Sequence, residues 1–313
     1  MLFRSGDPDV EVTLVARKET IRLVSGERVA GYTLNHSSPG PTITVRQGQL
    51  LQVTLVNGSV PDGVTLHWHG VDVPNAEDGV AGVTQDVVRI GGSFVYRFVP
   101  PDVGTYWYHS HQVSHDQVLR GLFGALVVLP RSGTADPPAA VGPALDQVAL
   151  VHTYGGRRTL NGRVGESRVD APAGSTVRVR VIDSDNGPLH VTTTGAPFRL
   201  VATDGHEVRE PGLVQGRAVA LGAGGRADLL VTTPADGSAV RVDLGGGPTY
   251  LVVGPPGASA PPAAPRGLPE LDLLRYGAPE PLPFDPQVAD RRFTYDIGRR
   301  IGFLDGRPGM WWT

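Results

Sequence analysis

Short stretches in which apolar and polar residues alternate constrain the fold of this chain more than any other feature. In LLQVTLVN (residues 50–57) and TVRVRVID (176–183), apolar side chains recur at every second position. Such residues share one face of a β-strand, so each stretch predicts a strand with one buried face. The 42 glycines and 28 prolines supply the turns that many short strands require. We therefore predict an all-β protein of antiparallel sandwiches or barrels. The best candidate for a short helix is PELDLLRYG (Pro269–Gly277), because proline suits the first helical position.

The chain also repeats itself, which indicates two related domains. YTLNHSSPGPTITVRQGQLLQVTLVNGS starts at Tyr32, and RTLNGRVGESRVDAPAGSTVRVRVIDSDNG starts at Arg158. Each runs from a Thr-Leu-Asn strand end, through a stretch rich in proline or glycine, to a turn and an alternating strand. We therefore predict one β-domain over residues 8–131 and a second over residues 146–256.

The C-terminal region predicts a linker followed by the start of a third copy. PPGASAPPAAPRG (255–267) has the composition of a linker, which we extend over residues 257–290. The final Trp-Thr dipeptide aligns with the Tyr-Thr and Arg-Thr dipeptides near the start of the two copies. We therefore interpret residues 291–313 as the lead-in to a missing third domain of a truncated chain. An ordinary C-terminal strand or tail is the alternative.

Composition argues against several classes of function. The chain has no cysteine, which rules out disulfides, thiolate metal ligands and thiol nucleophiles within these 313 residues. The formal net charge is −3, with acidic and basic residues mixed along the chain, so nucleic acid is not an expected partner. The N-terminus lacks the apolar segment of a signal peptide, and the longest apolar run, Gly121–Leu129, is too short to span a bilayer.

Four of the nine histidines form two His-x-His pairs, His67 with His69 and His109 with His111. Residues two apart on a strand face the same side, so each pair can direct two imidazoles toward one place. Neutral imidazole suits copper and zinc, and copper generally has the higher intrinsic affinity. A single pair is more often an accident of the surface or core, whereas two pairs in one predicted domain indicate a metal site.

At these motifs the chain resembles the multicopper oxidases, in particular the three-domain, laccase-like branch. The resemblance rests on HWHG (67–70), YHSH (108–111) and the turn SPGPTITVRQGQ (38–49). It implies two tandem cupredoxin-like Greek-key domains, β-sandwiches or barrels, with the start of a truncated third. The second predicted domain resembles the middle domain of the family, which carries no copper ligands.

The resemblance also implies a role for each histidine of the two pairs. His67 would bind the type 2 copper, His69 and His109 would bind one type 3 copper, and His111 would bind the other. Together they would form half of the eight-histidine trinuclear centre at which O₂ is reduced to water. Asp78 matches an acidic position that relays protons near that centre, whereas a turn-capping aspartate is the alternative interpretation.

In the family, the third domain supplies the other four histidines and the cysteine that binds the type 1 copper. The 313 residues contain none of these motifs. We therefore expect this chain alone to bind copper weakly and to be inactive as an oxidase. The complete protein is expected to couple the oxidation of a small phenolic, aromatic or metal-ion substrate to O₂ reduction.

Two other functions compete with this one. The first, and the main alternative, is a non-catalytic, cupredoxin-like copper-binding or assembly module. A two-domain oxidase completed within a trimer is disfavoured, because it needs a cysteine in its second domain. The family resemblance further implies an extracellular or cell-envelope location, and a face left open by a missing third domain would favour self-association.

The remaining histidines and the aromatic residues beside the pairs are expected to be structural or exposed. We interpret Trp68, Trp107 and Tyr108 as core packing that stiffens the ligand strands rather than as electron relays. His36 and His115 are expected in loops or at the surface. In the second copy, threonine replaces the second histidine of the first pair. The histidines of the second predicted domain are His152, His190 and His206.

Overall fold

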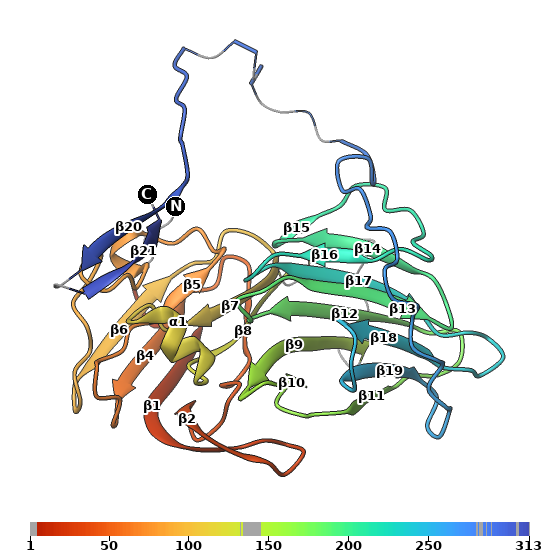
Figure 1. Ribbon diagram of the computed structural model, residues 1–313, viewed down its shortest axis with the longest axis horizontal. Coiled ribbons are helices and arrows are strands. Elements are labelled where there is room, and N and C mark those ends of the chain that lie inside the picture. Colours follow the sequence, from red (N-terminus) through yellow and green to blue (C-terminus); the bar gives the residue numbers. More distant parts are fainter. Residues whose placement is uncertain are drawn as a thin grey trace. The chain divides into compact units, whose positions relative to one another are not determined.

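The computed structural model describes residues 5–131, 133, 145–279, 281, 284–285, 287–288, 290–304 and 307–312. It divides into two compact units, Met1–Ala278 and Pro279–Thr313. Within the first unit, two groups of strands each enclose a hydrophobic core (Figure 1). The described residues include a short α-helix, α1 (Ser114–Leu119), and a 3-10 helix, η1 (Asn75–Glu77). The predicted all-β class is therefore confirmed.

The N-terminal sandwich consists of two four-stranded sheets. One has the order β2–β1–β4–β6, with bounds Arg28–Leu34, Val10–Arg22, Leu51–Asn57 and Ser93–Phe98. The other has the order β3–β8–β7–β5, with bounds Ile43–Arg46, Phe123–Leu129, Gly104–His109 and His67–His69. β1 pairs with β4, and β3 with β8, in parallel, whereas the other neighbours are antiparallel. The alternation in β4 buries every second side chain, as expected.

The second sandwich combines a six-stranded and a five-stranded sheet. The six-stranded sheet has the order β10–β9–β12–β17–β14–β15, with bounds Arg157–Leu160, Asp146–Tyr154, Thr176–Asp183, Arg226–Thr232, Phe198–Thr203 and His206–Glu207. The five-stranded sheet has the order β11–β19–β18–β13–β16, with bounds Glu166–Asp170, Tyr250–Gly254, Val240–Leu244, Leu189–Thr194 and Val219–Leu221. Val177, Val179 and Val181 of β12 lie in the core of this sandwich, as the alternation predicts.

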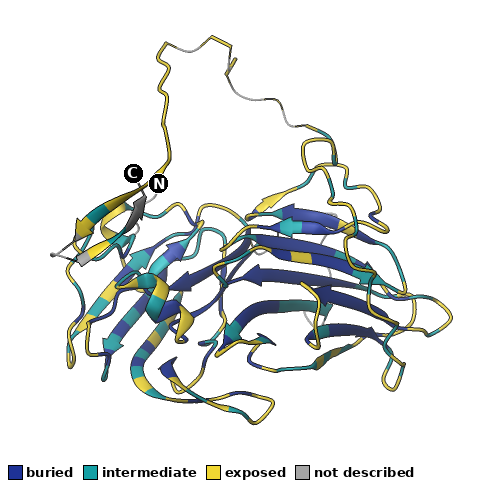
Figure 2. Ribbon diagram, viewed as in Figure 1, coloured by how far each residue is buried: buried dark blue, intermediate teal, exposed yellow. Residues whose placement is uncertain are grey.

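The polar face of β12 is buried as well, because it contacts the N-terminal sandwich. Figure 2 shows β12 and β17 buried along most of their length. Arg178 and Arg180 are only 4% and 3% exposed, and both donate to the carboxylate of Asp228, at 2.7 and 3.0 Å. Arg180 and Asp228 also hydrogen-bond Thr105 of β7, at 2.8 and 2.7 Å. Each buried charge therefore has partners that offset the cost of its desolvation.

The predicted helix over Pro269–Gly277 is wrong, since this stretch is extended and turned. Its backbone bonds the second sandwich instead: the Ala218 N–H donates to the Pro269 carbonyl at 3.0 Å, and the Leu271 N–H donates to the Ala218 carbonyl at 2.8 Å. The Tyr276 hydroxyl donates to the Gly212 carbonyl at 2.7 Å. These tertiary bonds outweigh the weak local preference for a helix.

The second unit contains a hairpin of two antiparallel strands, β20 (Arg299–Leu304) and β21 (Arg307–Trp312). The assignment of residues 291–313 to a third domain stays a prediction, and residues 305–306 and 313 lie outside the described residues. The bounds 8–131, 146–256 and 257–290 for the domains and linker also stay predictions.

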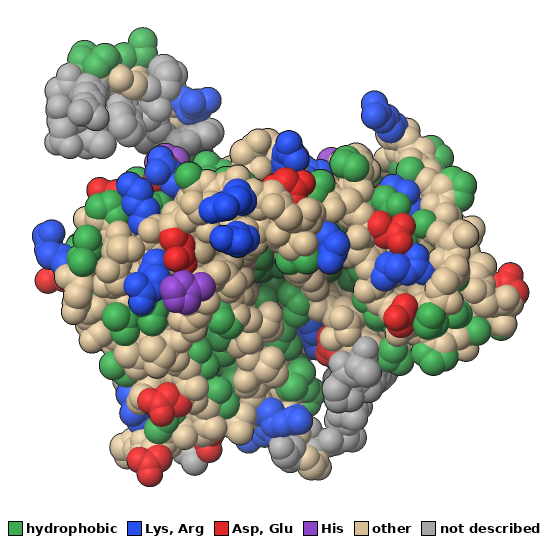
Figure 3. All heavy atoms as spheres, turned by 90° about the horizontal axis from the view of Figure 1, so that it is seen from below, with side chains coloured by type: hydrophobic (Ala, Val, Ile, Leu, Met, Phe, Trp, Pro, Cys, Tyr) green, Lys and Arg blue, Asp and Glu red, His purple; other side chains and the backbone are tan. Residues whose placement is uncertain are grey.

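Two properties of the described residues concern membranes and charged partners. Among these residues, no helix is long and apolar enough to cross a membrane. On the face shown in Figure 3, acidic and basic side chains are interspersed. This distribution matches the mixed charges along the sequence.

The carboxyl group of Asp183, at the end of β12, makes the stability of the fold depend on pH. Asp183 is 1% exposed, and its Oδ2 has no hydrogen-bond partner. Burial raises the pKa of Asp183 from an ordinary 3.8 to about 7. The folded chain therefore binds more protons than the unfolded chain between these two values. The free energy of unfolding falls as the pH rises from about 4 to 7.

We expect Asp183→Asn to change stability little at pH 4, where the wild-type carboxyl group is largely neutral. At pH 8 the variant should be more stable than the wild type by up to about 4 kcal/mol, at about 1.4 kcal/mol per pKa unit. Urea denaturation at both pH values measures the two differences. The same difference at pH 4 and pH 8 would contradict this assignment.

Candidate metal centre

The two His-x-His pairs lie on neighbouring antiparallel strands of the N-terminal sandwich. β5 contains His67 and His69, while β7 ends at His109 and is followed by His111. The register places His67 opposite His109 and His69 opposite Trp107. Because alternate side chains of a strand share one face, this pairing gathers His67, His69 and His109 on one side of the two strands.

The imidazole nitrogens of three histidines are close enough to share a metal centre. One nitrogen each from His67, His69 and His109 lie within 4.8 Å of one another. His69 Nδ1 and His109 Nε2 are 3.3 Å apart. Two imidazole nitrogens bound tetrahedrally to one ion at about 2.0–2.1 Å would be separated by about 3.3–3.4 Å. The donor set and its spacing therefore fit a metal that prefers imidazole.

His111 lies at the edge of this group. Its ring centroid is 5.4 Å from that of His67 and 6.2 Å from that of His109. The structure thus brings together all four histidines that the sequence predicts as ligands, three of them in a tighter cluster.

Backbone carbonyl groups fix two of the imidazole rings. His67 Nδ1 lies 2.9 Å from the Asp78 carbonyl oxygen, and His109 Nδ1 lies 2.9 Å from the Ser110 carbonyl oxygen. A ring nitrogen that donates to a carbonyl carries the proton, which leaves Nε2 of each ring free to bind a metal. No sequence pattern identifies these carbonyl groups as partners.

The surroundings keep two of the imidazoles neutral near pH 7. Burial lowers the pKa of His109 to about 3, against the opposing effect of the Ser110 carbonyl. Burial, followed by the charge of Arg226, lowers the pKa of His69 to about 4. Metal ions bind neutral imidazole, so neither ring has to lose a proton first.

Asp78 lies beside His67, on the side of Nδ1. Its carboxylate Oδ1 is 3.2 Å from His67 Nδ1. Asp78 follows the last residue of η1, and its N–H donates to the carbonyl of Asn75, the first residue of η1, at 3.2 Å. Asp78 therefore both orients His67 and closes a turn. The transfer of protons by its carboxylate stays a prediction.

A buried polar contact holds the segment between His109 and His111. The Ser110 hydroxyl donates to Gln117 Oε1 at 2.5 Å, and Gln117 Nε2 donates to the Gly63 carbonyl at 2.9 Å. Gln117 belongs to α1, so this short helix anchors the segment that carries the second histidine pair. Sequence reasoning missed Gln117, because an isolated glutamine after the motif carries no recognisable signal.

The aromatic residues beside the pairs are buried: Trp68, Trp107 and Tyr108. Trp107 also contacts a predicted ligand, because its ring stacks on His69 with centroids 4.8 Å apart and an interplanar angle of 29°. The role of Trp107 in packing therefore extends to the metal centre itself.

The other histidines of the first predicted domain and two of the second have surface or structural surroundings. His36, His115 and His206 are exposed. His152 is buried, with Nδ1 3.0 Å from the Ser184 hydroxyl. Burial lowers the pKa of His152.

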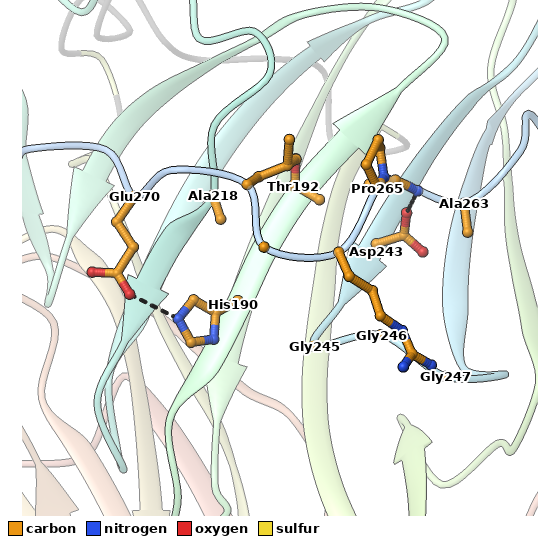
Figure 4. Close-up of a pocket in the computed structure, with 14 residues that line it drawn as sticks. His190, Thr192, Ala218, Asp243, Gly245, Gly246, Gly247, Ala263, Pro265 and Glu270 are labelled. Atoms are coloured by element: carbon orange, nitrogen blue, oxygen red, sulfur yellow. Dashed lines mark hydrogen bonds and ion pairs between the residues drawn. The ribbon is translucent and has the colours of Figure 1, made fainter.

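The second sandwich has a histidine at the repeat position of His67, but a different local structure. His190 Nε2 pairs with Glu270 Oε1 at 2.9 Å beside a cavity of about 840 Å³ (Figure 4). Thr192, at the position of the second histidine, donates its hydroxyl to the Arg217 carbonyl at 3.0 Å. Among the described residues, the group of three metal-binding side chains whose ligand atoms all lie within 4.8 Å of one another consists of His67, His69 and His109.

Comparisons with known proteins match this chain to multicopper oxidases. The multicopper oxidase family model matches residues 15–133, which contain all four histidines. Laccase-24 of Oryza sativa subsp. japonica is 29% identical over 341 residues, which cover 96% of this chain and 56% of that protein. L-ascorbate oxidase of Cucumis sativus is 40% identical over 107 residues, which cover 33% of this chain and 18% of that protein.

Solved structures give the same match. A multi-copper oxidase from Pseudomonas thermotolerans superposes with a TM-score of 0.69 and 29% identity, over 83% of this chain and 66% of that chain. The predicted cupredoxin-like fold is therefore confirmed. The chain spans less than two thirds of the length of the rice laccase and of the cucumber ascorbate oxidase.

Two glycines of the loop that follows β5 test how Asp78 orients His67. Gly79 has a φ of +73°, and an added Cβ would overlap the Leu66 carbonyl oxygen. Gly82 has a φ of +74°, and nothing lies within 4 Å of an added Cβ. Alanine thus strains the backbone at both positions, but only at Gly79 must it displace the chain next to Asp78 and His67.

We expect Gly79→Ala to weaken Cu²⁺ binding at least about tenfold, the loss typical when a partner of a ligating histidine is removed. Gly82→Ala should retain affinity close to that of the wild type. Isothermal titration of the two variants measures the difference. Equal affinities would mean that the Asp78 carbonyl does not orient His67 for metal binding.

Proposed function

We propose, since the chain belongs to the multicopper oxidase family, that His67, His69, His109 and His111 bind copper as one half of a centre at which O₂ is reduced to water. The observation that carries this proposal is the pairing of β5 with β7, which gathers His67, His69 and His109 on one face, with the ring centroid of His111 5.4 Å from that of His67. An all-imidazole donor set suits copper, which generally binds nitrogen ligands more tightly than the other divalent first-row metals.

Each histidine has a proposed place in this centre. The 3.3 Å separation of His69 Nδ1 and His109 Nε2 supports their sharing one type 3 copper. His67, whose Nε2 is free, is proposed to bind the type 2 copper. His111, at the edge of the cluster, is proposed to bind the second type 3 copper. Copper, when bound, would supply the one-electron chemistry that links a reducing substrate to O₂.

The protein residues around the metal have separate tasks. The carbonyls of Asp78 and Ser110 hold two imidazoles in the tautomer that leaves Nε2 free. The Asp78 carboxylate, which is partly exposed beside His67, is proposed to move protons during O₂ reduction.

The remaining ligands are proposed to come from outside these 313 residues. Four imidazoles supply half of the eight-histidine set, and the sequence has no cysteine for a type 1 site. A further domain of a longer chain, into which residues 291–313 would lead, is the proposed source. The complete protein is then proposed to oxidise phenolic, aromatic or metal-ion substrates outside the cytoplasm. The names of the rice laccase and the cucumber ascorbate oxidase support a small reducing substrate.

One observation favours a second candidate function. Because the 313 residues lack a thiolate for a type 1 site, they have no ligand set of that kind for electron entry. A non-catalytic copper-binding or assembly module would require only the four histidines, and self-association would be one way for it to complete its copper coordination.

Copper titration tests whether the histidine pairs are the ligands. We expect His67→Ala and His109→Ala each to weaken Cu²⁺ binding by more than the 10–100-fold typical for loss of an outer partner. His190→Ala is the matched control, because His190 occupies the repeat position of His67 but pairs with Glu270. Binding that is unchanged in His67→Ala and His109→Ala would show that other residues hold the metal.

Oxygen uptake tests whether these residues suffice for catalysis. We expect the purified 313-residue chain, loaded with copper, to consume no O₂ above the protein-free rate with a phenol or an aromatic amine. The reason is that it supplies four of the eight imidazoles and no thiolate. Four-electron reduction of O₂ by this chain, with copper bound at the stoichiometry of the family, would contradict the proposal.

A further inference from the structure

We infer that the turn Gly222–Gly225 of the second sandwich, which lacks a histidine pair of its own, positions His69 of the N-terminal sandwich for metal binding. This turn connects β16 to β17. A Cβ placed on Gly224 would lie 2.7 Å from His69 Cε1 and 3.0 Å from His69 Nε2. The backbone of Gly224 is therefore pressed against the His69 imidazole.

Gly224 and Trp107 together confine the His69 ring. Trp107 stacks on the ring at 4.8 Å, and its indole N–H donates to the Gly224 carbonyl at 3.3 Å. The same glycine thus contacts the imidazole and fixes the tryptophan that stacks on it. With Nε2 covered by Gly224, the nitrogen of His69 that faces His109 is Nδ1.

The turn is itself held rigidly. Gly224 has a φ of +77°, a conformation that glycine adopts without strain. Its N–H donates to the Asp183 carbonyl at 2.9 Å, and the Asp183 N–H donates to the Gly225 carbonyl at 3.0 Å. These bonds tie the turn to the end of β12, a strand that is buried on both faces.

Arg226 extends this contact to the residue that follows His69. Its guanidinium is buried and donates to the carbonyls of Gly224 and Thr105, both at 3.2 Å. A Cβ on Gly70 would overlap the guanidinium group. The glycine of the HWHG motif is therefore required both by its φ of +82° and by the close approach of Arg226.

The inference rests on the proposed copper site, and a matched pair of glycine variants tests it. Gly224→Ala adds a methyl group against His69. Gly237→Ala adds a methyl group at a position with a φ of +82°, where nothing lies within 4 Å of the added Cβ. Both variants carry the backbone strain of alanine at positive φ, but only Gly224→Ala contacts the imidazole. Trp107→Phe is a further variant, which keeps an aromatic ring at the stack but loses the N–H bond to Gly224.

Two measurements on the 313-residue chain separate this inference from the proposed function. We expect Gly224→Ala to lower Cu²⁺ affinity about tenfold relative to Gly237→Ala. In the metal-free chain, the Cε1–Hε1 NMR signal of His69 should shift in Gly224→Ala and keep its wild-type position in Gly237→Ala. Trp107→Phe should give the same loss of affinity and the same displaced signal even where Gly224→Ala does not fold.

The outcomes are distinct. The inference would be overturned, and the copper site left intact, if Gly224→Ala had wild-type copper affinity and an unshifted His69 signal. If Gly224→Ala does not fold, the same result in Trp107→Phe would overturn it. Copper binding that is unchanged in His67→Ala and His109→Ala would overturn the proposed function. The His69 signal would then still decide whether the turn orients the ring.

Discussion

The pairing register of β5 with β7 is the constraint on which the candidate metal centre depends. A shift of one residue would exchange the two faces of β5 and send the histidines into the core. Trp68, between the two histidines, prevents this shift, since it is fully buried and packs against Tyr96 and Phe98 with ring centroids 5.4 and 4.9 Å away. The burial of one large aromatic side chain thus fixes the face on which His67 and His69 lie.

The second sandwich stabilises the same register from outside. Thr105 lies near the start of β7, the strand that continues to Trp107 and His109. Its side chain hydrogen-bonds both Arg180 and Asp228. Removing one partner from such a buried network leaves an uncompensated charge, which typically costs about 3–5 kcal/mol. A hydrophobic cluster that includes Phe123 and residues of both sandwiches adds a nonpolar contact at the same boundary. A domain without a clustered set of metal ligands therefore contributes to the site through packing and charge.

Sequence patterns were sufficient to predict strands such as β4 and β12 and the convergence of the histidines. They were insufficient to predict the contacts that orient the histidine rings. Period-two alternation predicts β4 and β12, because a sandwich strand has a buried face whatever its partners are. The helix predicted over Pro269–Gly277, from the preference of proline for the first helical position, is wrong because backbone bonds to Ala218 decide the conformation. The His-x-His pairs predict which side chains converge, since spacing alone fixes the face of a strand. The contact of Gly224 with His69 joins residues far apart in the chain, so no local pattern predicts it.

The geometry of the cluster bears on how copper binding by this chain should be interpreted. Three imidazole nitrogens within 4.8 Å can hold a single ion, with a water completing a tetrahedral set. In the proposed centre, by contrast, His67 and the pair His69 and His109 bind different copper ions. Binding of one ion per chain would therefore demonstrate that the histidines converge, but not that they form half of a three-copper centre. The decisive quantity is the number of copper ions bound once the other ligands of the proposed centre are supplied, because only a multinuclear site gives His111 a metal of its own.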